Sequence, residues 1–388
     1  MHILLIHAIS AERRNLIDLL KSHKNTKQIT KFKSIESANG YLLKVTNDTS
    51  IPDVILVDNF NNSNKVLKLC SNMRKQTWLK YIPVLLLSDT SHMSFLERAI
   101  NHGVTDYINK PVHPTEVLNR ISLSVKLKIE SEENRRREKE LAYMFKSIHE
   151  DVELARQIQS GILPNEITDN NIQISALFQP SEQLSGDMYY WVKINDHQYA
   201  IILIDIVGHG IHAALVSMSF RSLLHGLLTR VVDPILVIEE LNDHIHQLFK
   251  QQNRTRLLNY YFTALYAVID TAEQTIEYVN AGHPDGLFIT EQQDLLLMNE
   301  GCPPIGLIPN MVVKKEKIAY HSQTKLLFFT DGLIEISNQK LWTDRLISHL
   351  KQSFYLDNEK LLNRIIDSRN NESIQNDDIC IIAINLKP

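Results

Sequence analysis

Short apolar runs alternate with amphipathic stretches over the first part of the chain. Residues 2–6 (HILLI), 54–58 (VILVD) and 84–88 (VLLLS) are each followed by a stretch whose apolar positions have helical spacing. These runs are almost wholly apolar, which is typical of strands that are covered on both faces. The pattern predicts a parallel α/β domain over residues 1–125.

The composition changes sharply after this domain. Residues 128–140 (KIESEENRRREKE) are almost all charged and contain no glycine or proline, which indicates a solvated helix. Apolar side chains then recur every seven residues until Pro164, and the same register extends back to a polar position at Asn134. The seam comprises Leu127, Asn134, Leu141, Met144, Ile148, Ala155, Ile158 and Ile162. We predict a helical linker over residues 126–164, either a coiled coil that pairs two copies of the chain or a single helix packed along its own domain.

The third region, residues 165–388, is rich in strand-like runs such as 199–207 (YAIILIDIV), which helical stretches such as 213–228 (AALVSMSFRSLLHGLL) interrupt. Runs of strands separated by grouped helices indicate an α+β domain. The length of 388 residues agrees with two or three domains.

Charge and cysteine content narrow the class of protein. Lysine and arginine total 41 against 45 acidic residues, so a net charge of -4 gives no electrostatic reason to expect nucleic acid or an anionic membrane as a partner. The three cysteines form no C-x-x-C pair, and no apolar run reaches the roughly 18 residues of a membrane span. We expect a cytoplasmic protein.

Three strand ends in the first domain carry reactive side chains: Asp58, Ser88 and Lys110. An aspartate that accepts a phosphoryl group, with a hydroxyl and a lysine to bind its oxygens, makes chemical sense as a set. This region resembles the receiver domain of bacterial response regulators. The resemblance implies a doubly wound, five-stranded parallel sheet, Asp58 as the phosphoacceptor, Ser88 and Tyr107 as switch residues, and Lys110 as the invariant lysine. It also implies a sensor histidine kinase or another upstream regulator.

The receiver family carries an acidic pair after its first strand that holds magnesium. His7 and Ala8 occupy those places here. An imidazole and a methyl group are poor ligands for a hard dication, so magnesium binding in this domain is not expected to be of the ordinary kind. Two alternatives follow: a receiver with weak phosphorylation or altered metal use, and a degenerate receiver that protein binding switches.

Four aspartates in the third region, Asp187, Asp205, Asp331 and Asp377, lie where an apolar strand meets a turn. Carboxylates at strand ends can converge on one edge of a sheet, where they repel each other unless a cation lies between them. Only oxygen ligands are offered, and no Cys/His spacing suggests zinc, so Mg²⁺ or Mn²⁺ is expected.

Eight ordered strings, from 155–164 (ARQIQSGILP) to 376–384 (NDDICIIAI), carry a second resemblance. The region resembles the metal-dependent, PPM-type serine/threonine phosphatases of the stage II sporulation E class. The resemblance implies a β-sandwich flanked by helices and a site with two Mn²⁺ or Mg²⁺ ions. Its ligands would be Asp187, Asp205, Asp331, Asp377 and the main-chain carbonyl of Ile206, with Asp378 as a supporting partner.

Two histidines are further candidates for a catalytic role, His209 and His283. His209 lies between two glycines, so it is either a proton donor to the leaving alkoxide or part of a turn or helix start. His283 in NAGHP is assigned to loop structure. Divalent ions in such a site would lower the pKa of a bound water and supply hydroxide for attack on a phosphoserine or phosphothreonine.

Together these features predict a phosphatase regulated by a receiver domain through the linker helix. The architecture implies that the substrate is a phosphorylated anti-sigma-factor antagonist of the STAS fold, in a partner-switching stress or signalling pathway. The alternative is a receiver-type adaptor that sequesters a signalling partner, with phosphatase activity secondary.

Overall fold

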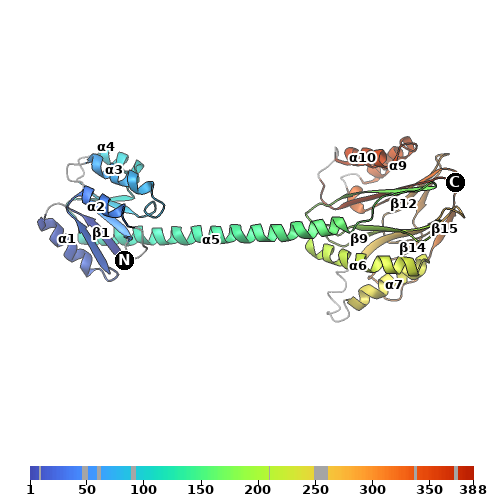
Figure 1. Ribbon diagram of the computed structural model, residues 1–388, viewed down its shortest axis with the longest axis horizontal. Helices are drawn as coiled ribbons and strands as arrows, with labels where there is room; N and C mark the ends of the chain where they lie inside the picture. The colour runs from blue at the N-terminus through green and yellow to red at the C-terminus, as the bar shows by residue number, and fades with distance from the viewer. Residues whose placement is uncertain are drawn as a thin grey trace. The chain divides into compact units, whose positions relative to one another are not determined.

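The computed structural model describes residues 1–7, 10–45, 51–58, 63–88, 93–208, 210–248, 261–335, 339–370 and 375–388. The chain forms two compact units, Met1–Lys146 and Ser147–Pro388 (Figure 1).

The N-terminal unit contains a five-stranded parallel sheet with strand order β2-β1-β3-β4-β5. Its strands and helices are β1 (His2–Ile6), α1 (Ser10–Ser22), β2 (Gln28–Phe32), α2 (Ile35–Leu42), β3 (Val54–Asp58), α3 (Ser63–Arg74), β4 (Val84–Ser88), α4 (Met93–Asn101), β5 (Asp106–Asn109) and the start of α5 (Pro114–Gly161). This arrangement confirms the predicted doubly wound α/β fold.

Helices cover both faces of this sheet, as the apolar runs predicted. One face packs against α1 and the start of α5 through Leu16, Leu20 and Ile121. The other face packs against α2, α3 and α4 through residues that include Leu69 and Phe95. Every position of β1, β3 and β4 is buried, so burial of apolar surface on two sides stabilises the sheet.

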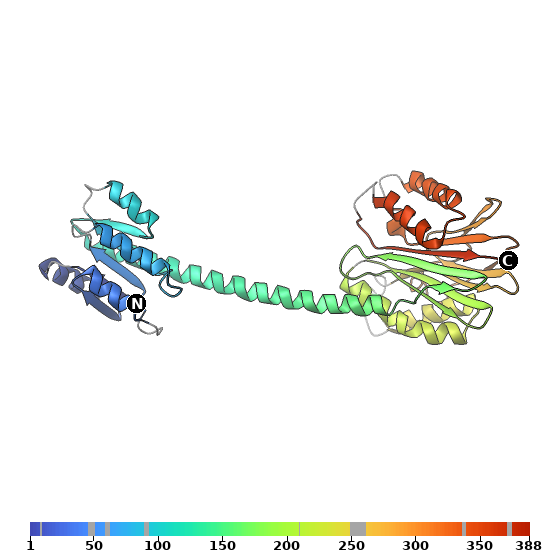
Figure 2. The same ribbon diagram turned by 45° about the horizontal axis from the view of Figure 1, so that its top comes forward.

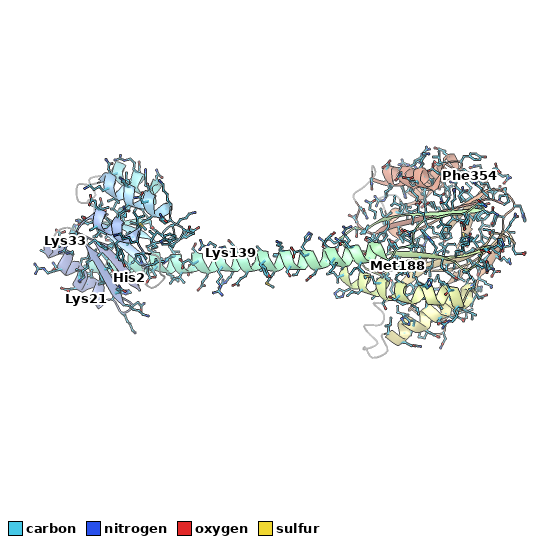
Figure 3. The ribbon with its side chains drawn as sticks, in the orientation of Figure 1. His2, Lys21, Lys33, Lys139, Met188 and Phe354 are labelled. Carbon is cyan, nitrogen blue, oxygen red and sulfur yellow. The ribbon has the colours of Figure 1, made fainter. Side chains whose placement is uncertain are left out.

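Helix α5 continues through the predicted linker as one element of 48 residues and ends at Gly161. Several seam residues are exposed along it, with exposed fractions of 53% for Leu141, 58% for Met144 and 55% for Ile148. Figure 3 shows the side chains on this helix around Lys139. These apolar seam side chains therefore lie exposed to solvent in the described part of the chain.

The C-terminal unit is a sandwich of two six-stranded sheets. The first sheet has the order β14-β11-β10-β9-β8, with β15 paired to β11, and the second has the order β13-β12-β16-β17-β7-β6. The strands are β6 (Ile167–Thr168), β7 (Ile172–Gln179), β8 (Met188–Lys193), β9 (Gln198–Ile206), β10 (Phe262–Asp270), β11 (Thr275–Ala281), β12 (Gly286–Thr290), β13 (Leu295–Met298), β14 (Gly301–Cys302), β15 (Glu316–Ala319), β16 (Thr324–Phe329) and β17 (Ile379–Leu386).

Helices flank both outer faces of the sandwich, as Figures 1 and 2 show. Helices α6 (Ile211–Arg230) and α7 (Pro234–Leu248) pack on the first sheet. Helices α9 (Gln339–Gln352) and α10 (Asn358–Asn370) pack on the second. A third apolar core, which includes Leu203, Leu265 and Phe328, fills the space between the sheets. The predicted β-sandwich flanked by helices is confirmed.

Helix α6 is the one helix in the described part of the chain whose length and hydropathy would suit a membrane span. Its buried residues include Phe220, Leu224 and Leu228, which belong to the core beneath the first sheet. An apolar core helix meets the same criteria of length and composition, so this finding is weak evidence for a membrane segment.

Candidate functional site

The four predicted aspartates lie at one end of each sheet of the sandwich. Asp187 directly precedes β8 and Asp205 lies near the end of β9, and these antiparallel neighbours bring both residues to the same end of the first sheet. Asp331 opens a short 3₁₀ turn (Asp331–Leu333) after β16, and Asp377 precedes the neighbouring β17. Each sheet therefore contributes two of the carboxylates.

Two glycines allow the loops that carry these aspartates to pack closely. A Cβ atom on Gly186 would lie 3.0 Å from the carbonyl oxygen of Ile206, and a Cβ atom on Gly332 would overlap the carbonyl oxygen of Asp378. Both neighbours are backbone atoms that cannot move aside easily, so only glycine fits. These two contacts bring Asp187 beside the end of β9 and Asp331 beside the start of β17.

Burial and the charges of neighbouring aspartates raise the pKa of three of these residues, Asp187, Asp205 and Asp331. Burial raises the pKa of Asp187 well above its usual range, and the charge of Asp205 adds to the effect. Burial, followed by the charges of Asp331 and Asp377, raises the pKa of Asp205 to about 7. Burial and Asp377 raise the pKa of Asp331 to about 6. A bound cation would favour the ionised form of these carboxylates.

One oxygen of the cluster is buried without a donor. Asp187 is 3% exposed, and its Oδ2 atom has no hydrogen-bond partner among the described residues. Such an oxygen is costly to bury unless a cation binds it. The other groups of the cluster also offer oxygen atoms, the ligands that Mg²⁺ and Mn²⁺ prefer. The residues therefore fit divalent cations, although their individual roles as ligands remain a prediction.

Asp378 has a supporting position beside the cluster. Its Oδ1 atom accepts hydrogen bonds from the backbone N–H of Ser181 at 2.7 Å and from the Ser181 hydroxyl at 2.9 Å, and its Oδ2 atom accepts one from the N–H of Gly186 at 2.8 Å. The side chain is 3% exposed. It therefore ties the start of β17 in the second sheet to the loop that carries Asp187 in the first.

A contact that the sequence did not predict joins α5 to this loop. The side chain of Gln159 donates to the carbonyl oxygen of Ser185 at 2.7 Å and accepts from its N–H at 3.1 Å. The Ser185 hydroxyl in turn accepts a hydrogen bond from the N–H of Asp187 at 3.0 Å. Figure 3 marks Met188, the next residue, near the C-terminal end of α5. A polar residue within a helical repeat gives no signal of such a long-range contact.

The two candidate histidines differ in outcome. His209 lies outside the described residues. His283 is buried, its Nδ1 atom lies 2.7 Å from the Thr263 hydroxyl, and burial lowers its pKa to about 3. A neutral, buried imidazole agrees with the expected structural role in the loop between β11 and β12.

In the N-terminal unit, Asp58, Ser88 and Lys110 lie at the carboxyl ends of β3, β4 and β5, which form one edge of the parallel sheet. The Lys110 Nζ atom lies 2.7 Å from Oδ1 and 2.8 Å from Oδ2 of Asp58. Tyr107 lies on β5 and is partly buried. The sequence predictions for these four residues stay untested beyond this placement.

His7 also contacts the predicted phosphoacceptor. Its Nε2 atom lies 2.9 Å from Asp58 Oδ2 and 3.6 Å from Glu12 Oε2, and the Lys110 ammonium is 3.8 Å from the same glutamate oxygen. Ala8 lies outside the described residues. Glu12 belongs to α1 and not to a strand end, so the strand-end pattern did not reveal it.

Comparisons with known families agree with this division of the chain. Residues 3–122 match the model of the response regulator receiver domain, and residues 195–387 match that of stage II sporulation protein E. The SiaA-PP2C domain of Pseudomonas aeruginosa has the same fold as the C-terminal unit. That structure aligns with a TM-score of 0.54 and 16% identity, over 64% of this chain and 99% of that one.

Two curated relatives are similar over a comparable stretch. Phosphoserine phosphatase RsbP of Bacillus subtilis is 34% identical over 61% of this chain and 58% of its own length. Protein IcfG of Synechocystis is 26% identical over 60% of this chain and 41% of its own length. The chain thus spans about half the length of these relatives. The chain therefore contains an N-terminal response regulator receiver domain and a C-terminal domain of the stage II sporulation protein E (PPM phosphatase) type.

Proposed function

We propose that this chain is a metal-dependent protein phosphatase that hydrolyses phosphoserine or phosphothreonine. We also propose that its receiver domain regulates this activity. The placement of two aspartates at the end of each sheet, together with the buried Oδ2 atom of Asp187 that lacks a hydrogen-bond partner among the described residues, supports the proposal. The similarity to a phosphoserine phosphatase supports the choice of reaction.

Two divalent cations, Mn²⁺ or Mg²⁺, would supply a nucleophilic water of lowered pKa and charge for the phosphoryl oxygens. The chain's own residues provide the rest. Asp187, Asp205, Asp331, Asp377 and the Ile206 carbonyl would hold the cations, and Asp378 keeps the two sheets in register at the site. The wall of the sandwich excludes water from Asp187, which strengthens the electrostatic interactions there.

The substrate we propose is a phosphorylated anti-sigma-factor antagonist of the STAS fold, in a partner-switching stress pathway. The combination of a receiver with a phosphatase of this family supports this choice by analogy of architecture. A sensor histidine kinase or another upstream regulator would act on the receiver. The three cysteines are free, which fits the reducing conditions of the cytoplasm, where we place the protein.

Helix α5 would pair with α5 of a second copy of the chain. In this dimer it would transmit a change in the receiver to the phosphatase domain. The seam side chains of α5 are exposed in a single chain, and a second copy in parallel register would cover them. Because Gln159 on the same helix holds Ser185, a change in helix pairing would reach the loop of Asp187 directly.

Hydrolysis of p-nitrophenyl phosphate at millimolar Mn²⁺ tests the enzyme. We expect activity in the wild type and its loss in Asp205→Asn and Asp331→Asn. The matched control is Asp196→Asn, an exposed aspartate in the β8–β9 turn, which should retain activity. An inactive wild type would favour the adaptor function instead. Candidate phosphorylated STAS proteins encoded beside this chain then test the substrate, with and without a phosphodonor for Asp58.

A further inference from the structure

A second cluster of metal-ligating side chains lies in the receiver, far along the chain from the phosphatase aspartates. Nε2 of His7, a carboxylate oxygen of Glu12 and a carboxylate oxygen of Asp58 all lie within 4.8 Å of one another. His7 and Asp58 are 2% and 3% exposed, whereas Glu12 reaches the cluster from the exposed side of α1. The three residues come from three elements: the end of β1, the first turn of α1 and the end of β3.

The spacing of these atoms suits a bound metal ion. Ligand atoms about 2.1 Å from one ion lie roughly 3.0 to 3.5 Å apart. The measured separations from His7 Nε2 are 2.9 Å to Asp58 and 3.6 Å to Glu12, so little movement is needed. A cavity of about 320 Å³, which His7, Glu12 and Lys110 help to line, adjoins the cluster and gives room for water ligands.

The donor set does not fit Mg²⁺. An imidazole nitrogen takes the place of a carboxylate, and Mg²⁺ prefers oxygen ligands. The ammonium of Lys110, bound to Asp58 at 2.7 Å, also neutralises part of the negative charge on which a hard cation depends. One imidazole with two carboxylates suits a first-row transition metal, because such ions form stronger bonds to nitrogen.

We propose that His7, Glu12 and Asp58 bind a transition-metal dication such as Zn²⁺ or Co²⁺. Asp58 would use its Oδ2 atom, so that Lys110 gives up its 2.8 Å contact with this oxygen and keeps its contact with Oδ1. Glu12 takes the part of the acidic group that the sequence lacks after β1. Metal binding by the receiver would then require a transition metal that binds nitrogen ligands, and not magnesium.

Zinc titration of the full-length chain tests this site. Asp205→Asn serves as the background, because it removes an expected ligand of the phosphatase site. We expect one zinc ion to bind, and His7→Gln and Glu12→Gln each to weaken that binding at least about tenfold. Glu36→Gln is the matched control, since Glu36 lies in the first turn of α2 as Glu12 lies in the first turn of α1, and it should bind zinc as the background does. Glu12 is largely exposed, so Glu12→Gln decides the matter even if His7→Gln fails to fold.

X-ray absorption at the zinc edge gives a readout that does not depend on activity. Scattering from one imidazole is expected in the background chain and should disappear in His7→Gln. Millimolar Mg²⁺ should leave the zinc in place, and His7→Asp should shift the preference towards Mg²⁺. Unchanged zinc binding in Glu12→Gln, equal loss in Glu36→Gln, or full displacement of zinc by Mg²⁺ would each overturn the proposal. None of these results tests the phosphatase aspartates. The proposed metal site in the receiver can therefore be refuted without refuting the proposed phosphatase activity, and the reverse also holds.

Discussion

Gln159 and Ser185 hold each other through two hydrogen bonds, one to the carbonyl oxygen and one from the N–H of the serine. Gln159 is the one residue of the last two turns of α5 that is fully buried, at 4% exposure. Both backbone groups of Ser185 therefore depend on a side chain of the linker helix, and Ser185 in turn orients Asp187.

Gln159→Ala should lower phosphatase activity about tenfold. The change leaves the N–H and carbonyl of Ser185 without partners in a buried place, at a cost of about 1 to 3 kcal/mol for each group. Steady-state hydrolysis of p-nitrophenyl phosphate measures the effect. Gln157→Ala, two residues away on the exposed side of the helix, is the control and should behave as the wild type. Equal activity of both variants would show that α5 does not position the site.

Gly332→Ala should remove activity and lower the free energy of unfolding by about 1 to 3 kcal/mol. The added methyl group would overlap the backbone of Asp378, and overpacking against backbone usually costs about 1 to 3 kcal/mol. Urea denaturation followed by tryptophan fluorescence reports the change. Gly226→Ala, at an exposed position of α6 with no atom within 4 Å, should instead stabilise the protein by about 0.5 to 1 kcal/mol. A neutral Gly332→Ala would contradict the packing described for the site.

Leu141→Asp should convert the expected dimer to a monomer. The substitution places a charge on the seam of α5, where Leu141 is 53% exposed in the single chain. Sedimentation velocity at micromolar protein gives the mass. Lys139→Asp changes a charge two residues earlier, off the seam, and should leave the dimer intact. A wild-type protein that sediments as a monomer would refute the pairing itself.

Lys325 should make the stability of the protein depend on pH. Its side chain is buried and donates a hydrogen bond to the carbonyl oxygen of Leu356, and burial lowers its pKa to about 8. The unfolded chain keeps the ordinary lysine pKa of about 10.4, so between these values the unfolded state binds the extra proton. The free energy of unfolding therefore rises with pH in this window, by up to about 1.4 kcal/mol per pH unit.

The comparison of the wild type with Lys325→Met isolates this effect, because the other titrating groups cancel in the difference. Urea unfolding at about pH 7.5 and about pH 9.5 should give a steeper rise for the wild type. Parallel pH profiles would mean that the ammonium is solvated in the folded protein.

Much of the fold could be predicted because many of its strands are continuous apolar runs with polar residues next to their ends. The positions of Asp58, Asp187, Asp205 and Asp331 follow from that pattern, and so does the parallel arrangement of the strands in the N-terminal unit. The edge strand β2 gave no such signal, since its residues (QITKF) are partly exposed and mixed in polarity. Local pattern also cannot reveal contacts between distant segments.

Gln159 and Glu12 illustrate this limit. Each lies in a helix, and the spacing of apolar residues in a helix predicts only which face is apolar. Gln159 contacts Ser185, which lies 26 positions away in the sequence. Glu12 shares a cluster of possible metal ligands with the more distant Asp58. The same holds for Gly332. A side chain at this position would overlap the backbone of Asp378, which lies just before β17, and only the tertiary structure shows this contact. Such residues become visible only when the tertiary structure brings the segments together.

The division of the four aspartates between two sheets has a consequence for how the proposed phosphatase activity can be lost. The distance between the two pairs of carboxylates depends on the thickness of the apolar layer between the sheets, which includes Leu203 and Phe328. A substitution deep in that layer would change the spacing of the two proposed cation positions without altering any of the proposed ligands. Loss of activity ahead of loss of folding would then be the ordinary outcome of core mutations in this domain, and not evidence that the mutated residue takes part in catalysis.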